Sequence, residues 1–277
     1  MTRSTIGMRP SKVLAKLRAG ETVRSIKVNL ADSRVIEIAA LAGFDCIWTD
    51  MEHVANDWSA IEKQILAAKA YDVDIVVRTA RGGYSDLVRP LELDATGIMV
   101  PHVMSFADAA SVVRQTKFHP LGRRPVDGGN ADGAYCLLDF QQYLQEANDQ
   151  RFTILQIEDP EPLEELEKIA GLPGVDMLFF GPGDFSQGIG APGKLDHPAV
   201  LEARRRVAEV AAAHRVFAGT VGTVSNQEEL IELGYQFINI GADVIGLGRY
   251  FRELASSYST ERSPAAALVT ESVYSDK

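Results

Sequence analysis

Short, nearly continuous apolar runs alternate along the chain with longer segments whose apolar positions recur with the helical period. The short runs span four to seven residues and are rich in Val, Ile and Phe. Such runs predict strands that are buried on both faces and therefore parallel. The eight expected strands are Ser25–Asn29, Phe44–Thr49, Asp74–Arg78, Gly97–Pro101, Phe152–Glu158, Met177–Gly181, Val216–Gly219 and Phe237–Gly241.

The longer segments predict helices between the strands. The clearest of them are Trp58–Tyr71, Phe106–Gln115, Leu163–Ala170, Pro198–His214 and Asn226–Leu233. Eight parallel strands that alternate with helices predict an α/β fold, the (β/α)8 TIM barrel. A doubly wound open sheet is the alternative, but no G-x-G-x-x-G motif follows the first strand. The 277 residues suit a single barrel domain over residues 1–277.

Charged side chains stand at the carboxyl ends of several predicted strands, where barrel enzymes place their active sites. In chain order they are Asp50, Glu52, His53, Arg78, His102, Glu158 and Asp184. Carboxylates, histidine and arginine on one rim are the groups needed to bind a metal, to move a proton and to hold a substrate carboxylate.

Glu158 and Asp184 are the candidate metal ligands. A carboxylate at the end of a buried strand needs a cation, a hydrogen-bond donor or a catalytic role. Mg²⁺ binds through few carboxylates plus water and substrate oxygens, and Mn²⁺ or Co²⁺ could replace it because the rim has no thiolate. A structural salt bridge at the end of the barrel is the alternative.

His53 is the candidate general base, because histidine titrates near neutral pH. Asp50 could orient His53 or hold a water on the metal. The alternative is a loop histidine capped by Asp57. Glu52 is interpreted as a turn residue.

Arg78 ends an apolar strand, and its planar guanidinium suits bidentate binding of a substrate carboxylate. An ion pair with Asp50 or Glu52 is the alternative. After the sixth strand, Gly181-Pro182-Gly183 leaves the backbone N–H groups of Gly183 and Asp184 free to approach an anion closely.

The longest segment without a strand or helix pattern runs from Phe118 to about Leu138 and contains Arg123 and Arg124. Because it comes after the fourth strand, we expect it on the active-site face as a lid or substrate loop. His102, at the end of that strand, is interpreted as a structural histidine.

Composition narrows the possible partners. The formal net charge of −10 and the pI near 5.1 argue against nucleic acid or an anionic membrane as the main partner. Two cysteines, Cys46 and Cys136, make no disulfide framework and predict a cytoplasmic protein. We expect neither a secretory signal nor a membrane span.

Five motifs, in order, resemble those of the HpcH/HpaI-type class II pyruvate aldolases. That group includes 4-hydroxy-2-oxoheptanedioate aldolase, 2-keto-3-deoxy-sugar-acid aldolases and macrophomate synthase. The motifs are Asp50-Met51-Glu52-His53 followed by Asn56-Asp57, Val77-Arg78, Val100-Pro101, Gln156-Ile157-Glu158 and Gly181-Pro182-Gly183-Asp184-Phe185-Ser186. The resemblance runs from about residue 12 to residue 255.

The resemblance implies a (β/α)8 barrel of the phosphoenolpyruvate/pyruvate superfamily and a class II aldolase, which is an aldehyde-lyase. Such an enzyme cleaves a 4-hydroxy-2-oxo acid to pyruvate and an aldehyde through a metal-stabilised pyruvate enolate. Other implied chemistries are oxaloacetate decarboxylation, carbon–carbon coupling of the macrophomate synthase kind, and that of citramalyl- or malyl-CoA lyase relatives.

The resemblance also assigns roles to site residues. It implies Glu158 and Asp184 as metal ligands, His53 as catalytic base together with Asp50, and Arg78 as the residue that holds pyruvate and stabilises the enolate. Gln156 would support the site, and the N–H groups of Gly183 and Asp184 would bind the substrate carboxylate.

Family members are usually homo-oligomers, trimers or hexamers, and exchange a carboxyl-terminal helix between subunits. This chain departs from the family pattern at Met51, where glycine is common, and in the stretch 122–130. The second departure leaves the identity of the acceptor aldehyde open.

Overall fold

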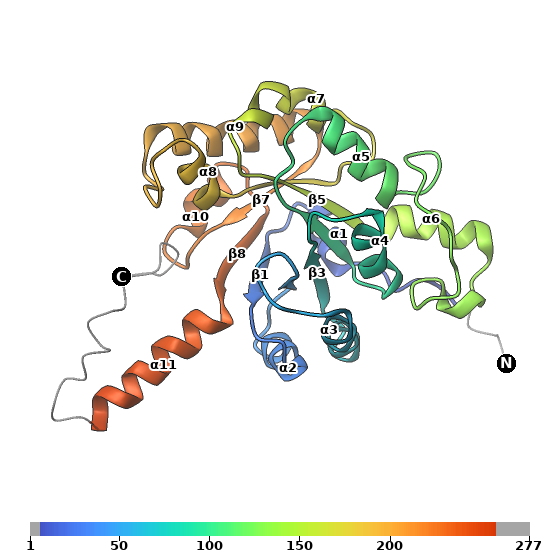
Figure 1. Ribbon diagram of the computed structural model, residues 1–277, viewed down its shortest axis with the longest axis horizontal. Coiled ribbons are helices and arrows are strands. Elements are labelled where there is room, and N and C mark those ends of the chain that lie inside the picture. The colour runs from blue at the N-terminus through green and yellow to red at the C-terminus, as the bar shows by residue number, and fades with distance from the viewer. Residues whose placement is uncertain (1–5, 259–277) are drawn as a thin grey trace.

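Eight parallel strands close into one barrel in the order β1 to β8, as predicted (Figure 1). The computed structural model describes residues 6–258. The strands are β1 (Val23–Val28), β2 (Cys46–Asp50), β3 (Asp74–Arg78), β4 (Gly97–Val100), β5 (Phe152–Ile157), β6 (Met177–Phe180), β7 (Phe217–Val221) and β8 (Phe237–Ala242). Every predicted strand is confirmed, with ends that differ by at most two residues.

Helices lie outside the barrel, and all but the last of them, α11, pack close to it. They are α1 (Lys12–Arg18), α2 (Ser33–Leu41), α3 (Trp58–Ala70), α4 (Tyr84–Glu92), α5 (Phe106–Thr116), α6 (Phe140–Gln150), α7 (Leu166–Ala170), α8 (Pro182–Gly188), α9 (Pro198–His214), α10 (Gln227–Glu232) and α11 (Asp243–Tyr258), with short 3-10 helices at Ala134–Cys136 and Glu161–Glu165. The five predicted helices are confirmed. None of the helices within residues 6–258 combines the length and apolar character needed to cross a bilayer.

Aromatic side chains fill the inside of the barrel. The Trp48 ring from β2 meets the edge of Phe179 from β6, with ring centroids 5.6 Å apart, and Phe179 in turn lies 6.3 Å from Phe237 of β8. The barrel is therefore a packed core, and only its carboxyl-terminal end is free to hold a substrate.

The segment 118–138 lies at the amino-terminal end of the barrel, so the prediction that it covers the active-site face is wrong. It follows α5 directly, and the helices of such a barrel lead back to the amino ends of the strands. Lys117, at its start, donates from Nζ to the carbonyl of Arg151, just before β5, at 2.8 Å. Within the segment, the N–H of Asp132 donates to the carbonyl of Glu92, the last residue of α4.

Buried charges hold this segment in place. Arg124 and Asp132 form a buried ion pair of 2.7 Å, and the hydroxyl of Tyr143 from α6 donates to the same carboxylate at 2.9 Å.

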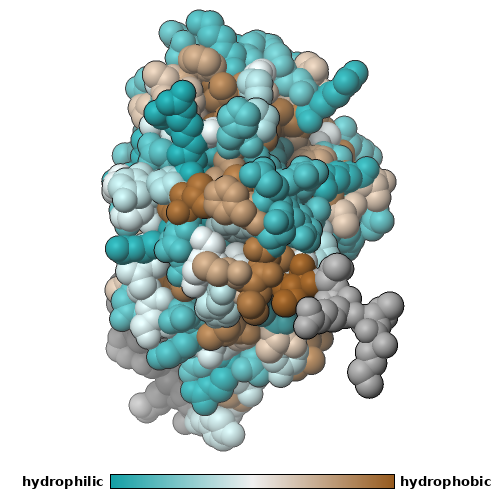
Figure 2. Space-filling model, turned by 90° about the vertical axis from the view of Figure 1, so that its right-hand side faces the viewer, coloured by the Kyte–Doolittle hydropathy of each residue, from teal (hydrophilic) through white to brown (hydrophobic). Residues whose placement is uncertain are grey.

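Figure 2 views the molecule from the side of α6 and shows apolar side chains gathered there. The exposed apolar residues of this part of the chain are Val126, Tyr135, Leu137 and Phe140.

Helix α11 extends away from the barrel at the lower left of Figure 1. It buries none of its residues, and Tyr250 and Phe251 are more than half exposed. Its first residue, Asp243, accepts the N–H groups of Asn29 and Leu30 at 2.9 and 3.0 Å, which ties the helix to the end of β1. Exchange of this helix between subunits stays a prediction, and residues 259–277 lie outside the described residues.

Candidate active site

A cavity of about 320 Å³ opens at the carboxyl-terminal end of the barrel. This is a size and a place typical of small-molecule sites in barrels. It is lined by Lys27, Asn29, Trp48, His53, Arg78, Gln156, Gly181, Gly183, Asp184, Val221, Asn239, Gly241, Ala242, Val244 and Ile245. Of the predicted site residues, the strand ends therefore bring His53, Arg78, Gln156, Gly183 and Asp184 to one space.

A buried ion cluster forms one wall of the cavity. The Arg78 guanidinium donates to both carboxylate oxygens of Asp50, at 3.0 Å from Nε and 2.5 Å from the terminal nitrogen. Lys27 Nζ lies 2.8 Å from the same carboxylate. Burial would raise the pKa of Asp50, but Arg78 and Lys27 hold it well below its usual range. Asp50 is thus a fixed anion that orients two cations.

Glu52 is more than the turn residue that the sequence suggested. Its carboxylate lies 3.1 Å from the Arg78 guanidinium and 3.5 Å from His53 Nε2. The turn forms because the Asp50 carboxylate accepts the N–H of Glu52 at 2.9 Å, while Asn56 Nδ2 donates to the Asp50 carbonyl. The ion pair of Arg78 with Asp50 and Glu52, raised as an alternative to substrate binding, is present, and Arg78 still lines the cavity.

His53 is exposed and faces the cavity from the loop after β2. The backbone N–H of His53 donates to the Asp50 carboxylate at 3.4 Å. The carboxylate beside the His53 ring is that of Glu52. Asp57 does not cap His53, because its side chain accepts the N–H of Ala60 and begins α3. An accessible ring beside a carboxylate is suited to accept a proton from a substrate.

Glu158 is buried at the end of β5. The N–H of His102 donates to one of its oxygens at 2.9 Å, and Gln156 Nε2 donates to the other. Burial raises the pKa of Glu158 to about 7; His102 opposes this shift, while the charges of Asp184 and Glu52 add to it. A carboxyl group that burial makes hard to ionise would be stabilised as an anion by a nearby cation.

The residues around Glu158 fit a hard divalent cation. Asp184, in the first turn of α8, lines the cavity, and its charge is among those that raise the pKa of Glu158. Gln156 Oε1 is buried without a hydrogen-bond partner. A methyl group on Gly181 would come within 2.7 Å of Glu158, so this glycine leaves the space that the carboxylate fills.

The atoms of Glu158, Asp184 and Gln156 that could bind a metal are all oxygens. No group of three or more His, Cys, Asp and Glu side chains able to hold a metal occurs among the described residues. Two carboxylates completed by water and substrate oxygens suit Mg²⁺ better than a metal that needs a full set of protein ligands.

His102, interpreted from the sequence as a structural histidine, lies beside Glu158, and its neighbour Asp159 is a residue that the sequence did not single out. His102 has a left-handed backbone with φ of 48°, and its Nδ1 lies 2.8 Å from Asp159. Burial lowers the pKa of the ring, but Asp159, Glu158 and Glu52 together raise it. This conformation turns the His102 N–H toward Glu158, and no residue pattern in the sequence signals it.

We expect the affinity for Mn²⁺, used as a probe of the site, to fall as the pH falls below about 7. A neutral Glu158 must lose its proton before it can bind a cation, and its pKa is about 7. The apparent Kd should therefore rise by about tenfold for each pH unit below this value and level off above it. This Kd is measured by titrating the protein with Mn²⁺ and monitoring free Mn²⁺ by electron paramagnetic resonance. The same Kd at pH values about one unit either side of the pKa would show that Glu158 does not bind the metal.

Comparison with known proteins gives consistent matches. Residues 26–247 match the family described as HpcH/HpaI aldolase/citrate lyase. The chain is 34% identical over 265 residues to the hydroxypyruvate/pyruvate aldolase of Pseudomonas aeruginosa, covering 94% of this chain and 96% of that protein. It is 30% identical over 252 residues to the 4-hydroxy-2-oxo-heptane-1,7-dioate aldolase of Salmonella arizonae, covering 91% and 95%.

The fold matches as well. The crystal structure of an HpcH/HpaI aldolase from Desulfitobacterium hafniense superposes with a TM-score of 0.82 at 29% identity, covering 90% of this chain and 97% of that one. The sequence matches and the structural match thus point to the same family over nearly the full length of the described barrel.

Proposed function

The chain belongs to the HpcH/HpaI aldolase/citrate lyase family, and we propose that it cleaves a 4-hydroxy-2-oxo acid reversibly to pyruvate and an aldehyde. The observation that carries this proposal is the convergence of His53, Arg78 and Asp184 on one cavity, with the buried Glu158 held beside it by Gln156 of the lining. An oxyanion bound there would meet the Arg78 cation. The relatives named above are aldolases of small oxo acids. The chain is accordingly a carbon–carbon lyase.

Glu158 and Asp184 would hold the metal, with Mg²⁺ as the proposed ion and Mn²⁺ or Co²⁺ as substitutes. When bound, such a cation acts as a Lewis acid that polarises the 2-oxo group of the substrate. Gln156 keeps one oxygen of Glu158 in place, and its own oxygen is buried without a hydrogen-bond partner. The N–H groups of Gly183 and Asp184 lie in the first turn of α8, where backbone N–H groups lack partners within the helix and can bind a carboxylate.

The remaining residues of the wall supply the proton transfer and the charge stabilisation. His53 removes the proton of the 4-hydroxyl group, and the electrons of the broken C3–C4 bond move onto the pyruvate half as an enolate. Arg78 faces the developing oxyanion, and Asp50 and Glu52 fix its direction. The enolate then takes a proton at C3 from the protonated His53, which restores the base, and the aldehyde leaves.

Lys27 is the cavity lysine, and an aldolase of the Schiff-base type would need a neutral lysine there. Its Nζ is held in an ion pair with Asp50 at 2.8 Å, so it is not free to attack a carbonyl carbon. This arrangement supports the metal-dependent route.

Pyruvate release tests the proposal most directly. A set of 4-hydroxy-2-oxo acids, including the seven-carbon diacid, is incubated with the protein and Mg²⁺, and pyruvate is followed with lactate dehydrogenase. Aldehydes and pyruvate are tested in the reverse direction. The absence of turnover in both directions would reject the aldolase proposal.

Replacing His53 by alanine should slow aldol cleavage by about 10²-fold or more, because a general base contributes about that much. Decarboxylation of oxaloacetate should fall much less, since that reaction requires no hydroxyl proton to be removed. The two rates are measured on the same preparation by pyruvate formation. Equal losses in both reactions would assign His53 to another role.

The proposed assembly is a homo-oligomer, a trimer or hexamer, in which a second copy covers α11. The exposed apolar residues of that helix support this: Val244, Leu247, Tyr250, Phe251 and Leu254. The free cysteines Cys46 and Cys136 support the proposed cytoplasmic location.

A further inference from the structure

The cavity has a second half that the pyruvate chemistry leaves unused. Glu158 and Asp184 belong to β5 and α8 on one side, while β1 and β8 lie across the closed barrel from β5 and form the other side. With the proposed pyruvate half held beside Glu158, the rest of the cavity extends toward β1, β8 and the first turn of α11. The residues of that half are Lys27, Asn29, Val221, Asn239, Val244 and Ile245.

Lys27 is the one ionisable side chain among these six lining residues. Its side chain is 19% exposed, and Nζ lies 5.4 Å from the centre of the buried Trp48 ring. Val244 and Ile245 make the neighbouring wall apolar. A short carbon chain with an anion at its end complements such a surface, because the chain contacts the apolar wall and the anion meets the ammonium group.

Asp50 has other hydrogen-bond donors besides Lys27. A carboxylate has about four acceptor positions. Arg78 fills two of these positions in Asp50, and the N–H groups of Glu52 and His53 approach it as well. The Lys27 ammonium group carries three protons and makes a single ion pair in the part of the chain that the structure describes. It therefore keeps donors for a ligand.

We propose that Lys27 binds an anionic group, a carboxylate or a phosphate, at the far end of the acceptor aldehyde. This inference rests on the proposed aldolase function and names the class of its second substrate. Lys27 determines specificity, and Arg78 serves the pyruvate half.

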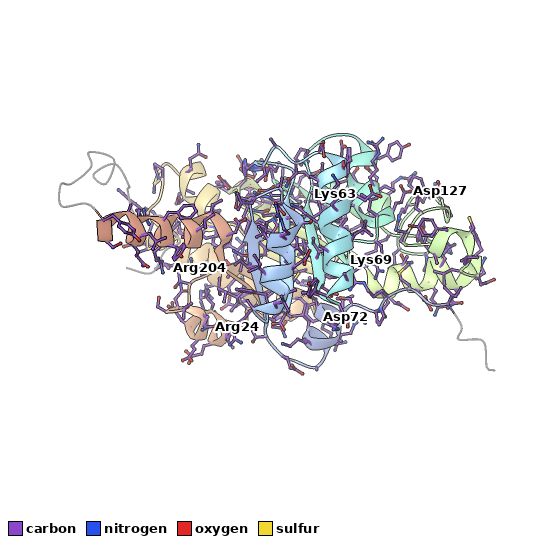
Figure 3. All side chains as sticks on the ribbon, turned by 90° about the horizontal axis from the view of Figure 1, so that it is seen from below. Arg24, Lys63, Lys69, Asp72, Asp127 and Arg204 are labelled. Atoms are coloured by element: carbon purple, nitrogen blue, oxygen red, sulfur yellow. The ribbon has the colours of Figure 1, made fainter. Side chains whose placement is uncertain are left out.

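Matched pairs of acceptors test this inference. Succinic semialdehyde is compared with butanal, which lacks the carboxylate, and glyceraldehyde 3-phosphate with glyceraldehyde, which lacks the phosphate. The kcat/KM for addition to pyruvate is measured for the wild type and for Lys27→Met and Lys27→Arg. Lys63→Met on the outer helix α3 is the control for loss of a lysine charge (Figure 3). Circular dichroism checks that each variant folds.

The wild type should prefer the anionic member of at least one pair, and that pair identifies carboxylate or phosphate. Lys27→Met should lower the ratio of anionic to neutral kcat/KM by at least about tenfold, mainly through KM, as expected for loss of a charge-assisted hydrogen bond. Lys27→Arg should retain most of the preference, and Lys63→Met all of it.

Four results would overturn the inference. Equal loss with charged and neutral acceptors in Lys27→Met would make Lys27 a residue that only positions Asp50. A wild-type enzyme active without any preference for anions would refute the inference and leave the aldolase proposal standing. Pyruvate attached to Lys27 after borohydride reduction would show a Schiff base instead. If no acceptor reacts at all, the aldolase proposal fails and this inference fails with it.

Discussion

Replacing Arg78 by alanine should lower kcat for pyruvate release by about 10³-fold, a loss at the upper end of that seen when one oxyanion donor is removed. Arg78 is buried, and its guanidinium lies 4.9 Å from the centre of the Trp48 ring, between Asp50 and Glu52. No neighbouring side chain can take the same position with the same two-pronged donor geometry. The charge that develops on the enolate oxygen would then face a cavity wall without its cation.

Removal of Arg78 also exposes a buried carboxylate, and breaking a buried pair can cost about 3–5 kcal/mol of stability. Lys27 remains beside Asp50 and limits that cost. Arg78→Lys separates the two effects, because it keeps a charge near Asp50 but loses the planar fork. We expect Arg78→Lys to fold well and still lose most of its activity. Circular dichroism and Mn²⁺ binding are measured together with kcat, and a variant that loses its metal along with its activity would mark Arg78 as structural.

Removing the metal should abolish the reaction, and so should Glu158→Gln. Lewis-acid stabilisation supplies several kcal/mol, which corresponds to about 10³-fold or more in rate. Treatment with EDTA should stop pyruvate release, and added Mg²⁺, Mn²⁺ or Co²⁺ should restore it. Glu158→Gln keeps the side-chain size and an oxygen but removes the anion, so excess metal should restore little activity.

Glu62→Gln, an exposed change on α3, is the matched control and should behave like the wild type. Activity that persists in EDTA, after dialysis has removed bound metal, would contradict the metal-dependent route. An active Glu158→Gln with unchanged Mn²⁺ affinity would assign the metal to other ligands.

The sequence was sufficient to predict the barrel and the rim because both depend on short-range patterns. Continuous apolar runs end at Asp50, Arg78 and just before Glu158, and strand ends in a parallel barrel meet at one face. The positions of these residues thus follow once the strands are known. Their chemical roles depend on the distances between strands that are far apart in the sequence.

Other features depend on backbone shape that no residue pattern carries. His102 reaches Glu158 through a left-handed backbone, and Glu52 reaches Arg78 because the turn after β2 folds back on Asp50. The prediction for the segment 118–138 was wrong for a simpler reason. It follows a predicted helix, and a loop between a helix and the next strand lies at the amino end of the barrel, opposite the active site.

The first turn of α11 has a consequence for redesigning the enzyme. Val244 and Ile245 line the half of the cavity proposed to hold the aldehyde, yet they belong to a helix held at its start by Asp243 and otherwise unburied. Arg78, proposed to hold pyruvate, ends strand β3, and Glu158 directly follows strand β5. Mutational libraries confined to Val244 and Ile245 can therefore explore new acceptors without disturbing the catalytic half of the site.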